Sequence, residues 1–324
     1  MHIAITGAAG FLGSKLARQL LANGALVGRS GRPEAISRIT LVDVTPATDF
    51  QDPRVSIVTG DISDPHTIAS VVTPDTDSIF HLAAIVSGHA ESDFDLGMAI
   101  NFDATRMLLE RIRGLGTRPR MVFTSSVAVF GGALPLRVPD TMALLPQSSY
   151  GTQKAMCELL VSDYSRRGYV DGRTLRLPTI SVRPGAPNKA ASSFASGIIR
   201  EPLNGQAAIC PVRGDTRMWL MSPHKAVLNL IHGHDLDAGR LGHTRSVSLP
   251  GLSITVSDMV AALERVAGAD VVQRIEWASD AAIERIVNSW PGDFDAHQAK
   301  ELGFSSDADF DSIIRAHMHD RETP

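Results

Sequence analysis

The sequence predicts an α/β fold in which a doubly wound parallel sheet is followed by a smaller C-terminal α+β subdomain. Three observations support this. A glycine-rich turn joins an apolar run to a helix near residue 6, apolar runs alternate with helical patterns up to residue 177, and Pro, Gly, Ser and Ala become frequent from Pro178 onward. Such strands lie parallel and bind ligands at their carboxyl ends. We therefore expect residues 1–180 to form a Rossmann-type domain, and residues 181–324 a smaller domain that can return a strand to the main sheet.

Composition argues against several classes of protein. The 324 residues include 31 basic and 35 acidic residues, and the net charge of -4 argues against a nucleic acid or anionic membrane held by bulk electrostatics. No apolar run of about 18 residues and no signal-peptide pattern occur, so we expect neither membrane insertion nor export. The two cysteines, Cys157 and Cys210, are too few for a disulfide framework. A cytoplasmic globular protein is predicted.

The first predicted strand, residues 2–5, leads into a turn with three glycines at fixed spacing. Gly7 can adopt the tight turn, Gly10 leaves room for a pyrophosphate beside the backbone, and Gly13 lets the next helix pack closely on the sheet. The helix over residues 14–21 offers unpaired N–H groups and the positive end of its dipole to that anion. Strand, turn and helix together predict a dinucleotide site.

An acidic residue follows each of the next two predicted strands, residues 39–42 and 55–58. Asp43 is placed to accept hydrogen bonds from the adenosine ribose and to repel a 2′-phosphate, which predicts NAD rather than NADP. The alternative interpretation of Asp43 is a turn residue at a strand end. Asp61 is placed to meet the adenine amino group.

The fourth predicted strand, residues 78–82, ends at Ala83 and Ala84, whose small side chains would let a cofactor approach the backbone. His81 belongs to this strand, and a histidine within an apolar strand is more often a core residue than a site residue. Apolar positions at helical spacing over residues 91–113 predict one long helix, which contains Asn101.

The fifth predicted strand and the helix after it carry the catalytic signal. Ser126 follows the strand at residues 121–124, and Tyr150 and Lys154 lie four residues apart in a helix predicted from about 149 to 168. This spacing places both side chains on one face, so the ammonium can stabilise a phenolate. Tyr150 could then take a proton from a substrate hydroxyl that Ser126 orients. Such a pair alone is usually a solvated helix face, but together with the glycine turn it predicts a catalytic site.

The C-terminal half shows weaker patterns. His232, His234 and Asp235 resemble a metal cluster, but in a polar turn after a helix they are more often a solvated loop, and we expect no metal. The remaining elements predicted from periodicity are a strand at 174–177, helices at 223–232, 257–267 and 279–288, and short strands containing Leu249 and Ile275.

Over residues 1 to about 185 the chain resembles the extended short-chain dehydrogenase/reductases, that is, the NAD-dependent epimerase/dehydratase family. The motifs that carry the resemblance are the TGxxGxxG turn, Asp43, Asp61, His81-Leu82-Ala83-Ala84, Ser126 and the Tyr150/Lys154 pair. It implies Ser126, Tyr150 and Lys154 as catalytic residues, with Ser125 as the alternative serine, and a homodimer formed through the two long helices. The NAD ligands that we expect are Gly7, Gly10, Phe11, Leu12, Gly13, Asp43, Asp61, Ile62, Leu82, Ala83, Ala84, Asn101, Tyr150, Lys154 and Pro178.

Three departures distinguish the chain from the nucleotide-sugar enzymes of that family. Val127 and Ala128 stand where related dehydratases carry an Asp-Glu pair as acid and base. Pro178-Thr179 stands where related epimerases carry Phe-Asn, and Phe130 replaces a usual tyrosine. These changes argue against an elimination and weigh against a nucleotide-diphosphate ligand.

Segments 81–88, 149–154, 176–185 and 187–194 most resemble family members that oxidise the C2 hydroxyl of a four-carbon sugar acid. We therefore predict an NAD-dependent dehydrogenase that converts such an acid to the 2-oxo acid. The alternatives are an NAD-dependent nucleotide-sugar 4-epimerase and, from another class, a non-catalytic dinucleotide sensor.

A sugar acid requires a partner for its carboxylate, and an Arg fork suits that group best. The sequence offers Arg183, Arg213 and Arg217 without distinguishing among them. The loop-rich C-terminal domain is expected to supply further contacts. The predicted substrate-binding residues are Ser87, Ser126, Thr179, Arg183, Asn188, Ser192, Arg213 and Trp219.

Overall fold

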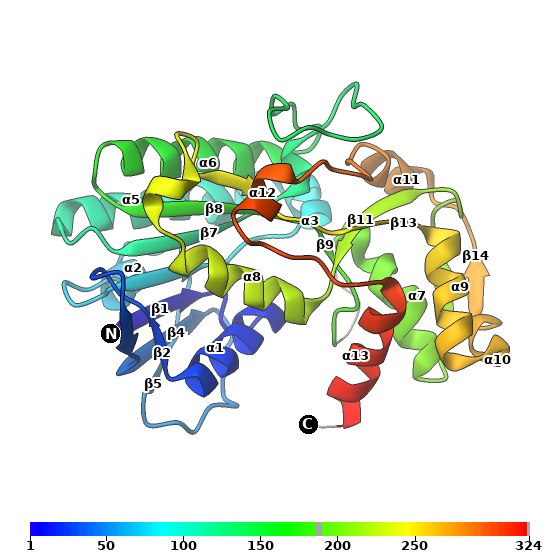
Figure 1. Cartoon of the computed structure of the whole chain (residues 1–324), viewed down its shortest axis with the longest axis horizontal. Coiled ribbons are helices and arrows are strands. Elements are labelled where there is room, and N and C mark those ends of the chain that lie inside the picture. The colour runs from blue at the N-terminus through cyan, green and yellow to red at the C-terminus, as the bar shows by residue number, and fades with distance from the viewer. Residues whose placement is uncertain (186–189, 323–324) are drawn as a thin grey trace.

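A computed structural model describes residues 1–185 and 190–322 of the protein, with side chains up to residue 320 (Figure 1). Seven parallel strands form the main sheet in the order β12-β8-β7-β6-β1-β4-β5. From β1 the chain first builds one side of the sheet and then the other, which confirms the predicted doubly wound α/β fold. The strands are β1 (His2–Thr6), β4 (Arg38–Asp43), β5 (Val55–Thr59), β6 (Ser78–His81), β7 (Arg120–Ser126), β8 (Asp171–Leu177) and β12 (Ser246–Ser248).

Helices cover both faces of this sheet. Side chains of β1 alternate between two cores, because successive strand residues point to opposite faces. Ile3 and Ile5 pack with α1 and α8, whereas Ala4 packs with α2, α5 and α6. Burial on both faces explains why the strands read as continuous apolar runs. These helices are α1 (Phe11–Asn23), α2 (Pro65–Val71), α5 (Ala104–Leu115), α6 (Ser149–Arg166) and α8 (Pro223–Asp235).

The long helix predicted over residues 91–113 is interrupted at Asp93 and is continuous from residue 94 to residue 115. The segment forms α3 (Ser87–Ser92), α4 (Phe94–Gly97), a π-helical stretch at Met98–Asp103 and then α5. The break lies at Asp93, whose carboxylate caps α4 by accepting a hydrogen bond from the Leu96 N–H at 3.0 Å. Capping by an aspartate side chain favours a new helix start over continuation of the old one.

The smaller lobe is of α+β type and has its own apolar core. One sheet joins β13, β11 and β9, and another joins β10 and β14. Figure 1 shows this lobe on the right, with α13 in red. Its strands are β9 (Thr179–Ile180), β10 (Ala208–Cys210), β11 (Arg217–Met221), β13 (Leu252–Thr255) and β14 (Ile275–Trp277). Its helices are α7 (Phe194–Leu203), α9 (Val256–Ala267), α10 (Ala269–Val272), α11 (Ala281–Val287) and α13 (Phe310–Glu322). Helix α12 (His297–Glu301) packs instead against β12 of the main sheet.

Periodicity located most elements of the main sheet but few of those in the smaller lobe. No element was predicted at the hairpin of β2 (Ala25–Val27) and β3 (Pro33–Ala35). The same is true of β9, β10, β11, β13, α7, α10, α12 and α13. Ile275 lies in a strand as predicted, whereas Leu249 comes one residue after β12. Short turns of 3-10 helix complete the chain at Val127–Val129, Ala191–Ser193 and Ala238–Leu241.

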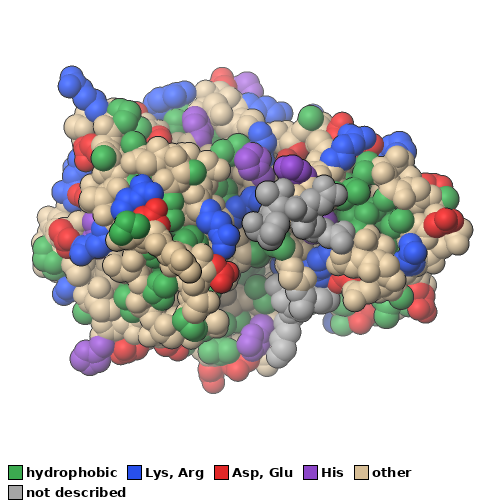
Figure 2. Space-filling model, turned by 90° about the horizontal axis from the view of Figure 1, so that it is seen from below, with side chains coloured by type: hydrophobic (Ala, Val, Ile, Leu, Met, Phe, Trp, Pro, Cys, Tyr) green, Lys and Arg blue, Asp and Glu red, His purple; other side chains and the backbone are tan. Residues whose placement is uncertain are grey.

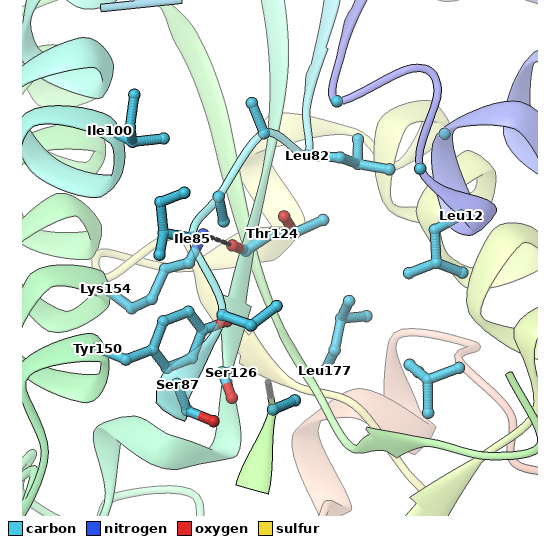
Figure 3. Close-up of a pocket in the computed structure, with 18 of the residues that line it drawn as sticks. Leu12, Leu82, Ile85, Ser87, Ile100, Thr124, Ser126, Tyr150, Lys154 and Leu177 are labelled. Atoms are coloured by element: carbon cyan, nitrogen blue, oxygen red, sulfur yellow. Dashed lines mark hydrogen bonds between the residues drawn. The ribbon is translucent and has the colours of Figure 1, made fainter. Parts of the chain in front are cut away.

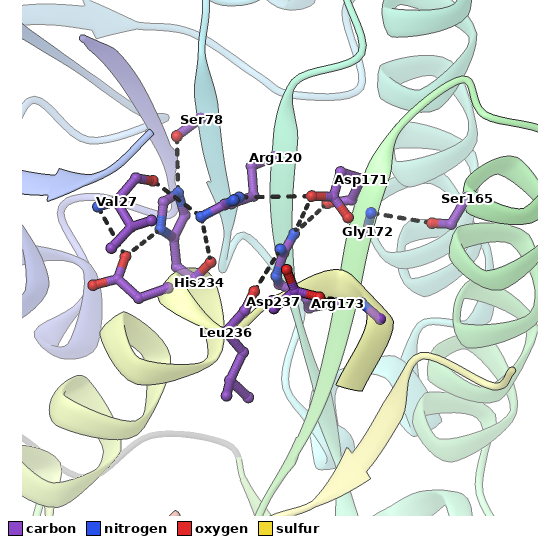
Figure 4. A network of polar contacts seen from close by, with 12 residues as sticks. Val27, Ser78, Arg120, Ser165, Asp171, Gly172, Arg173, His234, Leu236 and Asp237 are labelled. Atoms are coloured by element: carbon purple, nitrogen blue, oxygen red, sulfur yellow. Dashed lines mark hydrogen bonds and ion pairs between the residues drawn. The ribbon is translucent and has the colours of Figure 1, made fainter. Parts of the chain in front are cut away.

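The expected solvated loop at residues 232–235 is also wrong. These residues form the last turn of α8, which packs back onto α1, β7 and β8 of the main sheet. His234 is fully buried, and its ring lies 2.8 Å from both the Ser78 hydroxyl and the Asp235 carboxylate (Figure 4). Within the described residues, no group of three His, Cys, Asp or Glu side chains is arranged to hold a metal ion.

The surface mixes charges of both signs. Figure 2 shows Lys and Arg side chains interspersed with Asp and Glu over the face seen from below. Among residues 1–185 and 190–322, no helix has the length and apolar character needed to cross a membrane. Phe94 on α4 and Leu159 on α6 are exposed apolar residues, and the predicted homodimer through these helices remains a prediction.

Candidate active site

A cavity of about 620 Å³ opens at the carboxyl ends of β1, β4, β6, β7 and β8, between the main sheet and the smaller lobe (Figure 3). It gathers most of the residues predicted from sequence. Those predicted to bind the cofactor that line it are Gly7, Gly10, Phe11, Leu12, Gly13, Asp43, Asp61, Ile62, Leu82, Ala83, Ala84, Tyr150, Lys154 and Pro178. Those predicted to bind the substrate that line it are Ser87, Ser126, Thr179, Arg183 and Ser192.

The glycine turn leaves no room for side chains. Gly7 has a φ of 71°, and a Cβ placed there would lie 2.7 Å from the Ala83 nitrogen. A Cβ on Gly13 would lie 2.3 Å from the Gly7 carbonyl oxygen. Gly10 is the N-cap of α1 and offers no side-chain cap. The turn therefore presents bare backbone and the unpaired N–H groups of a helix start, which fits a dinucleotide pyrophosphate.

The two predicted adenosine ligands follow β4 and β5. Asp43 accepts hydrogen bonds from the Ala9 N–H at 3.0 Å and from the Thr45 N–H at 3.3 Å. Asp61 accepts from the N–H and the hydroxyl of Ser63, both at 2.8 Å. Each carboxylate thus stabilises its own turn and also lines the cavity, so the two interpretations of Asp43 are compatible.

The catalytic candidates converge from two elements. Helix α6 begins at Ser149, where the Ser148 hydroxyl caps it by accepting the Gly151 N–H at 3.2 Å. This start places Tyr150 in the first turn and Lys154 one turn later, both directed toward the end of β7 in Figure 3. The Lys154 ammonium is buried and donates a hydrogen bond to the Thr124 carbonyl at 2.9 Å.

Burial dominates the electrostatics of these groups. It raises the pKa of the Tyr150 phenol to about 12, and a hydrogen bond with Ser126 opposes that rise. It also lowers the pKa of Lys154 to about 8, against the opposing charges of Cys157 and Glu158. The chain's own groups therefore keep the phenol protonated at neutral pH, and the expected effect of Lys154 on Tyr150 does not outweigh burial.

The structure distinguishes between the two candidate serines. Ser125 is buried, and its hydroxyl donates to Glu158, which in turn holds the Arg176 guanidinium at 2.7 Å. Ser126 instead hydrogen-bonds with Tyr150 and accepts the Ala128 N–H at 3.1 Å. Ser126 thus contacts the phenol, whereas Ser125 belongs to the buried network behind it.

Three predicted ligands lie away from the cavity. Asn101 is buried behind it, where its amide pairs with the N–H and carbonyl of Ile85 at 2.8 and 3.1 Å and supports the cavity wall. Arg213 is exposed and paired with Asp215 at 2.9 Å. Trp219 is buried, and its indole N–H donates to the Leu249 carbonyl at 3.1 Å. A ligand role for these three residues is therefore not supported.

Three further residues complete the comparison between the predicted site and the structure. Asn188 lies outside the described residues. His81 is a core residue, as favoured: its ring nitrogens lie 2.6 Å from Thr6 Oγ1 and 3.0 Å from Thr105 Oγ1, and burial lowers its pKa to about 3. Trp290 lines the cavity as well, although it is not among the site residues predicted from the sequence.

The chain is similar to known proteins in sequence and in overall fold. The sequence model of the NAD-dependent epimerase/dehydratase family matches residues 3–222. The D-erythronate dehydrogenase of Cupriavidus necator is 59% identical over 99% of this chain and 98% of its own. The D-erythronate dehydrogenase of Haemophilus influenzae is 47% identical over 97% and 98%. A crystal structure named as the nucleoside-diphosphate-sugar epimerase from Agrobacterium tumefaciens superposes with a TM-score of 0.93 at 46% identity, covering 99% of this chain and 94% of that one.

Proposed function

Because the chain belongs to the NAD-dependent epimerase/dehydratase family, we propose that it is a D-erythronate dehydrogenase that oxidises the C2 hydroxyl of this four-carbon acid. The observation that carries the proposal is the 59% identity, over nearly the whole of both chains, to an enzyme of that name. The convergence of Ser126, Tyr150 and Lys154 on one cavity supports it. A small acid suits a cavity of about 620 Å³ that must also accept a dinucleotide.

The described residues suit NAD. The bare turn at Gly7, Gly10 and Gly13 would hold the pyrophosphate, and Asp43 would hold the adenosine ribose. When bound, NAD supplies the hydride acceptor and a positive charge near the phenol. Lys154 is anchored on the Thr124 carbonyl and would contact the nicotinamide ribose.

The chain's own groups would manage the proton. The Ser126 hydroxyl orients the C2 hydroxyl of the substrate beside the Tyr150 phenol, with which Ser126 already hydrogen-bonds. The Tyr150 oxygen then takes the C2 hydroxyl proton once a nearby positive charge has lowered its pKa. The buried Lys154 ammonium, one helical turn away, stabilises the phenolate that this role requires.

Two alternatives remain to be tested. The resemblance to the Agrobacterium tumefaciens structure favours a nucleotide-sugar epimerase, in which the same catalytic set would produce no net NADH. Against it, Thr179 lines the cavity where the epimerases that the sequence resembles carry Asn. A non-catalytic sensor would have no need of Tyr150 and Lys154, and both line the cavity.

The deciding experiment mixes the purified protein with NAD⁺ and D-erythronate and follows NADH, with D-threonate, L-threonate and UDP-glucose in parallel. We expect NADH with D-erythronate, and a loss of roughly 10²–10⁴-fold in kcat for Tyr150→Phe, since the proton acceptor is removed. Tyr164→Phe is the matched control on the same helix, because the Tyr164 hydroxyl bonds Glu110 away from the cavity. An epimerised sugar nucleotide without NADH from any acid would overturn the proposal.

A further inference from the structure

Charge is segregated along the cavity. Its described lining contains two carboxylates and two basic groups. Asp43 and Asp61 follow β4 and β5, at one edge of the main sheet. Lys154 and Arg183 lie at the other end, on α6 and after β9 of the smaller lobe. The reacting end of the described cavity is therefore positive, without a carboxylate to balance it.

In the part of the chain that the structure describes, the Lys154 ammonium has a hydrogen-bond partner and the Arg183 guanidinium does not. The Lys154 ammonium donates to the Thr124 carbonyl from a fully buried position. Within the described residues, the Arg183 guanidinium has neither an ion-pair nor a hydrogen-bond partner. Burial, followed by the nearby Arg200, lowers the pKa of Arg183 to about 10, so the group stays charged at neutral pH. Leaving a desolvated cation without a partner is costly, and an anionic ligand would remove that cost.

The backbone of Arg183 is held in place from α7. Its N–H donates to the Ser196 hydroxyl at 3.0 Å, and its carbonyl accepts from Arg200 at 2.7 Å. Arg200 is in turn paired with Glu201. These three neighbours support the main chain of Arg183, a residue that lines the cavity. The arrangement is a preorganised cationic wall rather than a solvated surface residue.

We infer that Arg183 binds the carboxylate of the substrate and makes the cavity select 2-hydroxy acids over neutral polyols and amides; this inference rests on the proposed function. The other two arginines that the sequence offered are excluded, because Arg213 pairs with Asp215 at the surface and Arg217 is exposed beside Ser253. A guanidinium fork suits the planar carboxylate, with two parallel N–H···O bonds. A neutral analogue would leave the cation unpaired, and sites of that kind reject such analogues strongly.

The test compares D-erythronate with D-erythronamide, its neutral carboxamide, in wild type, Arg183→Met and Arg183→Lys. Wild type should prefer the acid in kcat/KM by roughly 10²-fold or more. Arg183→Met should lose roughly 10²–10³-fold on the acid and abolish that preference, because a buried charged partner is removed. Arg183→Lys keeps the charge but lacks the fork, so it should retain a preference for the acid at lower kcat/KM.

Binding provides a second readout that does not depend on turnover. With NAD⁺ present, D-erythronate should raise the Tm of wild type but not that of Arg183→Met, while the Kd for NAD⁺ should stay within about twofold in both, since the Asp43 end is untouched. Arg213→Met is the matched control and should behave as wild type. If wild type oxidises D-erythronate and Arg183→Met matches it, the inference is overturned and the proposed function stands. If wild type oxidises no acid, both fall.

Discussion

The strands of the main sheet all point the same way, so their carboxyl ends form one rim of the sheet, here called the carboxyl edge, and their amino ends form the opposite rim, the amino edge. These two edges use charged groups in opposite ways. At the carboxyl edge, Asp43, Asp61, Lys154 and Arg183 line the cavity, and within the described residues none of them belongs to an ion pair. At the amino edge, three arginines surround one carboxylate, that of Asp171 (Figure 4). Unpaired charges in a cavity are available to a ligand, whereas paired charges hold the fold together.

The amino edge forms a closed network. Asp171 lies 3.0 Å from Arg173, 2.8 Å from Arg245 and 3.6 Å from Arg120. Arg120 also donates to the His234 carbonyl at 3.1 Å, and Arg173 donates to the Leu236 carbonyl at 2.9 Å. These carbonyls lie at the end of α8, where cations are favoured by the helix dipole. The network therefore attaches α8 to the starts of β7 and β8.

The largest effect that we expect at the amino edge is the loss of stability caused by Asp171→Asn. Burial alone would raise the pKa of Asp171, but Arg173 and Arg245 outweigh it and hold the pKa below its ordinary value. Removing the carboxylate charge leaves three clustered arginines without a counter-ion, so we expect a loss of about 3–5 kcal/mol in the free energy of unfolding. Urea unfolding measures this loss.

The matched control is Asp163→Asn, because Asp163 pairs with Arg166 on the exposed surface of α6 and should change stability little. In conditions where Asp171→Asn remains folded, its kcat/KM should equal that of wild type. A change in NAD⁺ affinity at unchanged stability would contradict the division between the two edges.

The features that could be predicted from the sequence and those that could not also differ in a simple way. The glycine turn and the Tyr150/Lys154 spacing depend on neighbours within eight residues, so sequence alone located them, and the alternation of strands and helices led to the correct fold class. The lack of an acidic partner for Arg183 among the described residues depends on segments far apart in the chain. Sequence could therefore propose three arginines but not choose among them.

Two residues lie in surroundings other than those expected, for related physical reasons. Asn101 was expected at the cofactor, but contacts with Ile85 and Gln153 turn its amide into a support for the cavity wall. His234 was expected in solvent, but α8 returns to the main sheet and buries it against Ser78. In both cases tertiary packing decided the environment, and no local pattern of residue types encodes it.

A smaller effect, confined to the carboxyl edge, is expected from Asp43→Asn. The amide keeps the size of the side chain but loses the charge that would repel a 2′-phosphate. We expect the ratio of kcat/KM for NAD⁺ over that for NADP⁺ to fall by roughly 10²-fold, with the free energy of unfolding nearly unchanged. Asp52→Asn, which affects a carboxylate paired with Arg54 outside the cavity, is the control for cofactor choice. An unchanged ratio would leave Asp43 as a turn residue only.

The smallest effect should be the pH dependence contributed by His234 at the amino edge. Burial lowers its pKa to about 4, and Asp235 only partly opposes this. Between pH 6.5 and 4 the unfolded chain binds a proton on His234 that the folded chain does not bind. The contribution of His234 to the free energy of unfolding is therefore fully present above pH 6.5 and is lost as the pH drops. His234→Gln should remove about 2 kcal/mol of the stability difference between pH 7 and pH 5, measured by urea unfolding at both values. His81, whose pKa is lowered to about 3, should sustain the remaining dependence, and the exposed His297→Gln should alter nothing. If His234→Gln instead shifted the pH profile of turnover, the amino edge would be coupled to the chemistry, and the two edges could no longer be regarded as separate in function.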